Sequence, residues 1–398
     1  MAEKGRTEAN CDLGKINQIA NEVGERREDE NGNSNIGDVN VNFKDFKNAI
    51  DCHERDLKIS REVGDRAGEE RAYGNFGNAC ESLGDPQKAT EYHERHLNTL
   101  KEVGETAEEG RAYGNLGNAC YGLGDFQKAI EYYERRLKIA KEVGDRVGEG
   151  GAYGNLGNAY YSLGDFQKAI EYHEGHLKIS KEMGDRAGEG GAYGSLGNAL
   201  KKLGNVQKAM ECHERHLKIS KEVGHRRGEG GAYGNLGNDY YSLGDFQKAI
   251  ECHERHLKIS KEVGDRAGEG RAYCNLGIAY CGLGDFQKAI EFLERDLKIS
   301  KEVGDRAGEG TAYGNLGNVF KQFGDFQKAR EYHERHLKIS KEVGDRAGEG
   351  TAYGNLGNAF QNLGDFQNAI EYYERRLKIA KEVGDRAGEG EALSLIHI

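Results

Sequence analysis

The chain repeats itself every 40 residues, and this period constrains its fold more than any other feature. The segment Gly-Asp-Phe-Gln-Lys-Ala-Ile-Glu at 124–131 returns unchanged at 164–171, 244–251 and 284–291. A fixed period of about 20–50 residues is typical of solenoids, in which each unit buries its apolar face only against its neighbours. We count eight full copies, which span 65–104, 105–144, 145–184, 185–224, 225–264, 265–304, 305–344 and 345–384.

The two ends depart from the repeat. Residues 1–64 are predicted to form an N-terminal cap with a degenerate repeat, of which the half from Phe46 to Gly64 matches well. Residues 385–392 begin another copy, but after Ala392 the chain reads Leu-Ser-Leu-Ile-His-Ile. Codons for these six residues can resemble a transposon-end sequencing adapter. We therefore expect 393–398 to be a non-native tail and 385–392 to be the start of a truncated repeat.

Each copy is predicted to form two helices. Asp145 and Asp165 are good N-caps for the two helices of one copy, and Gly184 is a typical C-terminal stop. The single proline, Pro86, falls in the first turn of a second helix, where its missing N–H costs nothing. The apolar face of the first helix is formed by Tyr153, Leu156, Gly157, Tyr160 and Leu163. The pattern predicts an all-α fold, an α-α superhelix of 40-residue helical hairpins.

Composition limits the possible partners. The formal charge is −11, which argues against binding to a nucleic-acid backbone or to an anionic membrane. The N-terminus lacks the apolar segment of a signal peptide, and no apolar run is long enough to span a membrane. The eight cysteines show no CxxC spacing, so we interpret them as reduced thiols of a cytoplasmic protein.

The repeated residues resemble the tetratricopeptide repeat. Its pattern of an aromatic residue, Leu-Gly, a second aromatic residue and a later alanine matches Tyr153, Leu156, Gly157, Tyr160 and Ala169. The 40-residue period and the motif Gly-Asp-Arg-x-Gly-Glu look most like the Pins/LGN-type G-protein-signalling modulators, and the tetratricopeptide repeat protein 28-like group is also similar. The resemblance implies a superhelix whose first helices line a concave groove for partner proteins.

A polar face of the first helix is predicted to line this groove. Positions are counted from the tyrosine of each copy, such as Tyr153. At +2 stand Asn75, Asn115, Asn155, Asn235, Asn275, Asn315 and Asn355, and at +5 stand Asn78, Asn118, Asn158, Asn198, Asn238, Asn318 and Asn358. An asparagine amide can donate and accept at once, so this ladder suits the backbone of an extended peptide. Two alternatives stay open: the asparagines recur because the copies are recent duplicates, or they satisfy neighbouring groups between helices.

Three other positions belong to the same face. Glycine at +1, as in Gly154, would let a ligand approach the helix backbone. Positions −2 and +8 vary most between copies and would set side-chain specificity, unless exposed sites simply drift. The candidate residues there are Arg71, Arg111 and Arg271 at −2, and Tyr121, Tyr161 and Tyr241 at +8.

No motif points to catalysis, a cofactor or a metal. Histidine pairs three residues apart, such as His173/His176, have a spacing that could hold a metal. The first histidine occupies a packing position that is tyrosine in other copies, and the second alternates with arginine, which indicates a solvated face. The sequence also contains no GxSxG, P-loop or HExxH motif.

We therefore expect an adaptor that is not an enzyme and that binds extended segments of other proteins. The resemblance to the Pins/LGN-type modulators implies a role in G-protein-linked cell polarity or spindle orientation, with recruitment to the cell cortex. Two alternatives are a self-associating structural solenoid and the recognition region of a larger protein whose C-terminal effector domain is missing.

Overall fold

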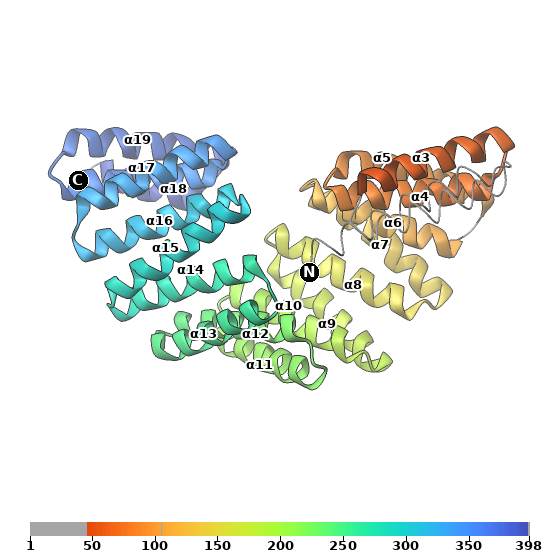
Figure 1. The fold of residues 1–398 in the computed structure, drawn as a ribbon, viewed down its shortest axis with the longest axis horizontal. Coiled ribbons are helices and arrows are strands. Elements are labelled where there is room, and N and C mark those ends of the chain that lie inside the picture. The colour runs from red at the N-terminus through yellow and green to blue at the C-terminus, as the bar shows by residue number, and fades with distance from the viewer. Residues whose placement is uncertain (1–45, 105, 397–398) are drawn as a thin grey trace, which may run out of the picture. The chain divides into compact units, whose positions relative to one another are not determined.

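The computed structural model describes residues 46–104 and 106–396, which form α-helices joined by short turns (Figure 1). The first half of the degenerate repeat and Cys11 lie outside the described residues. The chain divides into two compact units, Met1–Ala199 and Leu200–Ile398, and each is described by itself.

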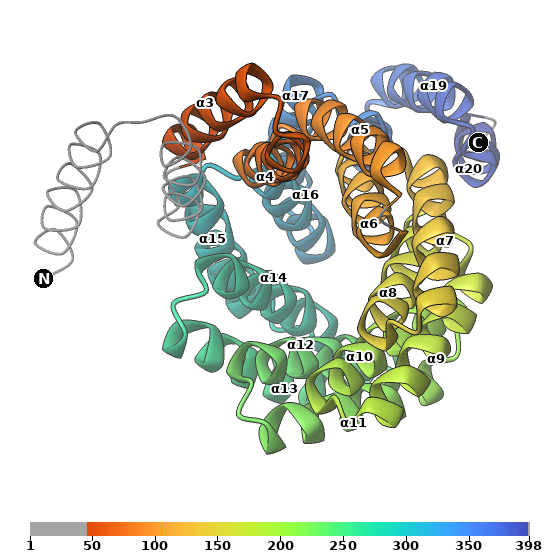
Figure 2. The same cartoon turned by 90° about the vertical axis from the view of Figure 1, so that its right-hand side faces the viewer.

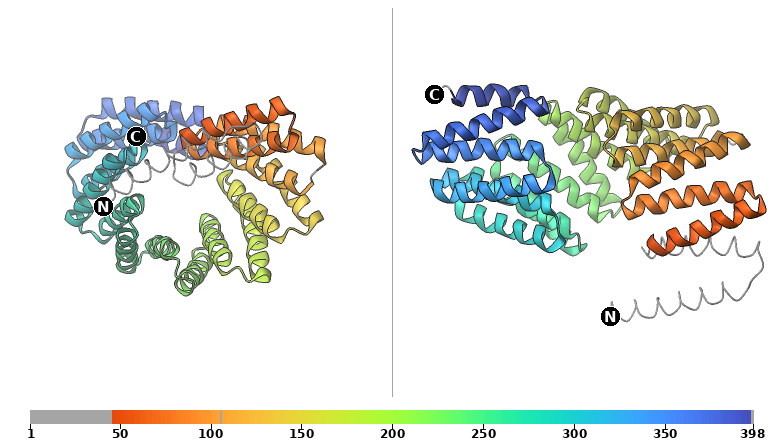
Figure 3. Two further views of the ribbon diagram at one scale, coloured as in Figure 1. Left: turned by 45° about the vertical axis from the view of Figure 1, so that its right-hand side comes forward. Right: turned by 90° about the horizontal axis from the view of Figure 1, so that it is seen from above.

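The helices alternate between first and second helices of the repeats. The first helices are α4 (Arg66–Leu83), α6 (Thr106–Gly122), α8 (Arg146–Ser162), α10 (Arg186–Lys202), α12 (Arg226–Ser242), α14 (Arg266–Leu283), α16 (Arg306–Phe323), α18 (Arg346–Asn362) and α20 (Arg386–Ile396). The second helices are α3 (Phe46–Val63), α5 (Pro86–Val103), α7 (Phe126–Val143), α9 (Phe166–Met183), α11 (Val206–Glu222), α13 (Phe246–Glu262), α15 (Phe286–Val303), α17 (Phe326–Val343) and α19 (Phe366–Val383). Consecutive helices within each unit run antiparallel, side by side (Figure 3).

The helix boundaries confirm the predicted caps. The Asp145 carboxylate accepts a hydrogen bond from the Gly148 N–H at 2.9 Å, and Asp165 accepts one from Lys168 at 3.1 Å. Each satisfies an N–H group that has no partner inside the helix. Gly184 ends α9 in the left-handed conformation, with φ of 69°. Pro86 occupies the first turn of α5.

The motif Gly-Asp-Arg-x-Gly-Glu links the two helices of a hairpin in most copies. The Arg66 guanidinium lies 2.8 Å from Glu69 in the same helix and 2.7 Å from Glu102 at the end of α5. The same bridging arginine recurs at Arg146, Arg226, Arg266, Arg306 and Arg346. The motif therefore closes the start of the first helix onto the end of the second.

The core lies within repeats and between neighbouring repeats, and it combines alanines with larger apolar side chains. In one cluster, Ile130 and Tyr133 of one repeat pack against Leu156 and Ala159 of the next. Ala159 is fully buried, so helices approach closely there. Leu163 is a departure from the predicted apolar face: it is 45% exposed, because α8 ends at Ser162 and the Leu163 side chain lies beyond the packed part of the helix.

The first helices lie on the inner side of each unit's curve (Figure 2). Neighbouring first helices touch, as α4 touches α6 in one unit and α12 touches α14 in the other, whereas neighbouring second helices make no comparable contact among the described helices. The face predicted to line the groove is therefore carried by the inner helices of each unit. In the part of the chain that the structure covers, no helix is both long and apolar enough to traverse a bilayer.

Candidate functional site

The asparagines predicted at +2 and +5, here called the asparagine ladder, all lie on first helices. All seven at +2 are half-buried. At +5, Asn78, Asn158 and Asn318 are exposed and the others are half-buried. The amides thus reach solvent on the inner helices of each unit.

Members of the ladder bind one another across neighbouring repeats. The Asn115 amide donates to the Asn78 Oδ1 atom at 3.2 Å, and the Asn155 amide donates to the Asn118 Oδ1 atom at 3.3 Å. At these two junctions the asparagines therefore satisfy neighbouring groups between helices, which was one of the two alternatives to a groove role. The Nδ2 group of Asn118 and the Oδ1 atom of Asn155 keep no partner among the described residues, so the junction still offers one donor and one acceptor.

Tyrosines of the second helices orient two +5 asparagines. The Tyr133 hydroxyl donates to Asn118 Oδ1 at 2.9 Å, and the Tyr373 hydroxyl donates to Asn358 Oδ1 at the same distance. Both tyrosines are buried. The asparagine side chains are therefore held in place before any ligand arrives, which lowers the entropic cost of binding.

The variable positions also lie on the inner helices. The +8 tyrosines, Tyr121, Tyr161 and Tyr241, pack against the first phenylalanine of the following helix, with ring centroids 5.2 to 5.4 Å apart. At −2, Arg71, Arg111 and Arg271 are exposed. Arg111 lies 2.7 Å from Glu108, and Arg271 lies 3.4 Å from Asp265.

The +1 glycines do not open the helix backbone to a ligand, contrary to the prediction. A Cβ atom on Gly154 would lie 3.3 Å from the His176 ring, and one on Gly114 would lie 2.6 Å from the Arg136 guanidinium. The second helix of the same repeat thus fills the space with its own side chain. These glycines are required by internal packing.

The sequence predicted a solvated face for the second histidine of each pair, and this prediction is wrong. His96 and His256 are only 7% exposed because they pack over the +1 glycines. The first histidines are buried as predicted, and burial lowers the pKa of His173 to about 4. Among the described residues, no three His, Cys, Asp or Glu side chains gather in a group that could hold a metal.

The copy at 265–304 departs from the others in two linked places. Cys274 replaces the +1 glycine, and the shorter Asp296 replaces the histidine that would pack over it. Burial raises the pKa of the Asp296 carboxyl to about 7. In the copy at 105–144, Asn118 and Tyr133 are joined by a hydrogen bond. Ile278 and Leu293 stand at the equivalent positions here, so an apolar pair replaces the polar one.

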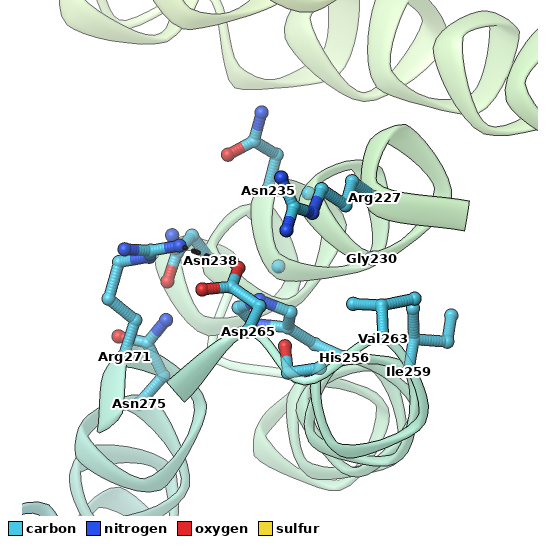
Figure 4. A pocket seen from close by; sticks show the side chains of 13 residues that line it. Arg227, Gly230, Asn235, Asn238, His256, Ile259, Val263, Asp265, Arg271 and Asn275 are labelled. Carbon is cyan, nitrogen blue, oxygen red and sulfur yellow. Dashed lines mark hydrogen bonds and ion pairs between the residues drawn. The ribbon is translucent and has the colours of Figure 1, made fainter. Parts of the chain in front are cut away.

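A pocket of about 170 Å³ opens on the inner face between α12, α13 and α14 (Figure 4). Four predicted residues, Asn235, Asn238, Arg271 and Asn275, line it. The remaining lining residues are Arg227, Gly230, Gly231, Gly234, His256, Ile259, Ser260, Val263 and Asp265. Arg227 and Arg271 extend towards the pocket from different helices.

The sequence contained a signal for the most informative missed residue. Arg227 stands where the other full copies have alanine, or valine at Val147. The predicted face begins at position −2 before the tyrosine, whereas Arg227 lies one turn earlier on the helix and so falls outside it. The second-helix residues of the pocket, such as Ile259, carry no such signal because they are the same in most copies.

The repeated hairpins and their inner polar faces define an all-α repeat solenoid. The family model described as "Tetratricopeptide repeat" matches residues 29–102, 92–142, 108–182, 148–222, 186–262, 228–302, 268–342 and 308–382. The chain belongs to the tetratricopeptide repeat family, whose members are commonly protein-interaction scaffolds. No curated protein matches the chain.

Several solved structures share the fold. The apo quorum sensor NprR from B. thuringiensis has 17% identity and a TM-score of 0.62, and the match covers 86% of this chain and 98% of that one. A Rap protein complexed with competence and sporulation factor has 17% identity and a TM-score of 0.60, over 90% of this chain and 99% of that one. BtubC from P. vanneervenii has 26% identity and a TM-score of 0.50, over 55% of this chain and 92% of that one.

Proposed function

We propose that this chain is a protein-binding scaffold whose inner faces hold extended segments of partner proteins. The observation that carries the proposal is the asparagine ladder, which has at least one member in every full copy and reaches solvent. Five members are oriented by bonds with neighbouring asparagines or with Tyr133 and Tyr373: Asn78, Asn115, Asn118, Asn155 and Asn358. Oriented amides at a fixed spacing match the regularly spaced donors and acceptors of an extended backbone. Solved structures of similar fold include a Rap protein complexed with competence and sporulation factor.

The proposal extends to the setting that the sequence resemblance implies. A Pins/LGN-type modulator would act in the cytoplasm, at the cell cortex, in G-protein-linked polarity or spindle orientation. This finer assignment depends on the 40-residue period and on the Gly-Asp-Arg-x-Gly-Glu motif. In this chain the motif also caps the first helix and links it to the second helix in the copies that carry it.

Self-association is the second candidate, and one observation favours it. A row of large apolar side chains at the ends of the first helices is more than 40% exposed, with Leu83, Leu243 and Phe323 the most exposed at 53%, 53% and 61%. A concentration-dependent rise in mass, measured by multi-angle light scattering on the chain alone, would support it.

Selection from a phage-displayed library of random peptides, each roughly a dozen residues long, tests the scaffold proposal. The wild-type chain should enrich peptides, and the Asn115/Asn118/Asn155/Asn158→Ala variant should bind them at least about tenfold more weakly, because each lost neutral hydrogen bond costs about 1 kcal/mol. The matched control replaces four exposed second-helix residues, Asn98, Lys138, Lys178 and Lys218, by alanine.

The control variant should bind the selected peptides with an unchanged Kd, measured by fluorescence anisotropy. Failure of the wild-type chain to enrich any peptide would overturn the proposal. So would equal binding by the asparagine variant, since peptides would then be held elsewhere.

A further inference from the structure

We propose that the pocket between α12, α13 and α14 binds the carboxylate of an aspartate or glutamate side chain in the partner segment. This inference rests on the proposed function and gives that segment a chemical requirement: one acidic residue opposite Arg227 and Arg271.

Arg227 is an exposed arginine that lines the pocket. It is exposed near the start of α12, and no carboxylate in the described parts of the chain pairs with it. The equivalent residues are Ala67, Ala107, Val147, Ala187, Ala267, Ala307 and Ala347. Since the seven other full copies have no charge here, helix packing does not require the arginine.

Arg271 supplies a second guanidinium from the next repeat. It is the −2 residue of α14, and Figure 4 shows it and Arg227 on the same pocket. Among the eight full copies, no other neighbouring pair has arginine at both equivalent positions; the degenerate copy at 25–64 carries Arg27, which precedes Arg71 of the first full copy. Two guanidiniums facing one space can bind a single carboxylate through charge-assisted hydrogen bonds.

Glycine keeps the mouth of this pocket open. A Cβ atom on Gly231 would meet nothing within 4 Å, whereas the same −2 position carries arginine or threonine in several other copies. The cavity of about 170 Å³ exceeds the roughly 30 Å³ that one water molecule occupies in the liquid. A carboxylate group and bridging water therefore both fit.

The charges of the wall favour one negative charge. Arg227 and Arg271 contribute two positive charges, and Asp265, 3.4 Å from Arg271, contributes one negative charge. Burial, together with the nearby Arg271, lowers the pKa of His256, so this side chain is neutral at pH 7. The net charge of about +1 matches a carboxylate better than a phosphate, which carries nearly two charges at pH 7.

The polar residues around the arginines fit an acidic residue on an extended peptide. Asn235, Asn238 and Asn275 of the asparagine ladder line the same pocket. The ladder would hold the peptide backbone while the two arginines hold the acidic side chain. Specificity and backbone binding then come from different residues, which makes them separable by mutation.

The test uses the peptides selected by the wild-type chain and two variants. Arg227→Ala/Arg271→Thr installs residues that other copies carry at these positions, so the fold should be kept. The control, Lys138→Ala/Lys178→Ala, removes the same number of positive charges from exposed second-helix positions outside the pocket. Each protein is titrated with a selected peptide, with its Glu→Gln form and with a form carrying phosphoserine at the same place.

The peptides selected by the wild-type chain should share an acidic residue at one position. Changing it to glutamine should raise Kd at least about tenfold. The Arg227→Ala/Arg271→Thr variant should lose the same affinity and should no longer distinguish the two peptides, while the control still does. Adding Ala307→Arg/Thr311→Gly/Thr351→Arg to that variant should restore the preference at the equivalent junction of α16 and α18.

Four results would overturn the inference. They are selected peptides without a shared acidic residue, an unchanged Kd for the Glu→Gln peptide, tighter binding of the phosphoserine form than of the glutamate form, and no recovery in the transplanted variant. In all four cases peptides still bind, so the proposed function stands. Only a wild-type chain that enriches no peptide removes both.

Discussion

At the scale of single residues, glycine has two opposite effects within the first helices. A glycine inside a helix costs up to about 1 kcal/mol relative to alanine. At Gly157 that cost is offset, because the His173 ring packs directly against the missing side chain. Gly191 is exposed, and a Cβ atom placed on it would meet nothing within 4 Å, so nothing offsets its cost.

Alanine substitution at these two glycines should therefore change stability in opposite directions. Gly157→Ala should lower the free energy of unfolding by about 1–3 kcal/mol, since the added methyl group overpacks the helix contact. Gly191→Ala should raise it by up to about 1 kcal/mol. Urea unfolding followed by circular dichroism measures both, and changes of the same sign would contradict the assignment of Gly157 to a packing role.

A second residue-scale feature is a buried charge in the copy at 225–264. Asp239 stands where the other copies have alanine or valine, and it is fully buried. The Asp239 carboxylate lies 2.6 Å from the His213 Nδ1 atom and 3.2 Å from the Lys201 ammonium. Lys201 is a variable +8 residue, so variation on the inner face is coupled here to a change inside the core.

At the scale of helices, caps explain why the boundaries could be predicted from the sequence. Asp145, Asp165 and Gly184 act through bonds within a few residues, and such local bonds leave a readable pattern. The use of Gly154 was predicted wrongly because the residue that fills its space, His176, comes from the other helix. The pocket was missed in part for the same reason: periodicity shows which face a residue lies on, but not which side chains from other helices meet there.

The first helix at 226–242 has a weakened N-terminal cap. His225 replaces the usual aspartate and makes no side-chain cap hydrogen bond, whereas Asp345 caps the equivalent helix through Gly348 at 2.9 Å. His225→Asp should raise the free energy of unfolding by about 0.5–2 kcal/mol, and Asp345→Ala should lower it by a similar amount. Thermal unfolding of the two variants checks this, and no gain from His225→Asp would show that the cap is not limiting there.

At the scale of the whole molecule, a buried histidine that recurs in several copies has a multiplied effect on the stability of the chain. Burial lowers the pKa of His93 and His173 to about 4 and that of His253 and His333 to about 3, from an ordinary value of 6.5. The unfolded chain therefore binds protons more readily than the folded chain between pH 6.5 and about 4. Stability from these groups is fully present above pH 6.5 and is lost as the pH falls through this window.

The melting temperature should accordingly fall steeply between about pH 6.5 and 4.5, since each such histidine contributes about 1.4 kcal/mol per pH unit. Glu302 and Glu342 have pKa values below 4.5, so their titration falls beneath this range. His173→Tyr should weaken the pH dependence of the melting temperature, because it removes one buried imidazole. The fold should accept tyrosine, since Tyr133 stands at the equivalent position, where its hydroxyl bonds to Asn118. Identical slopes for His173→Tyr and wild type would show that buried histidines do not control the acid sensitivity of the array.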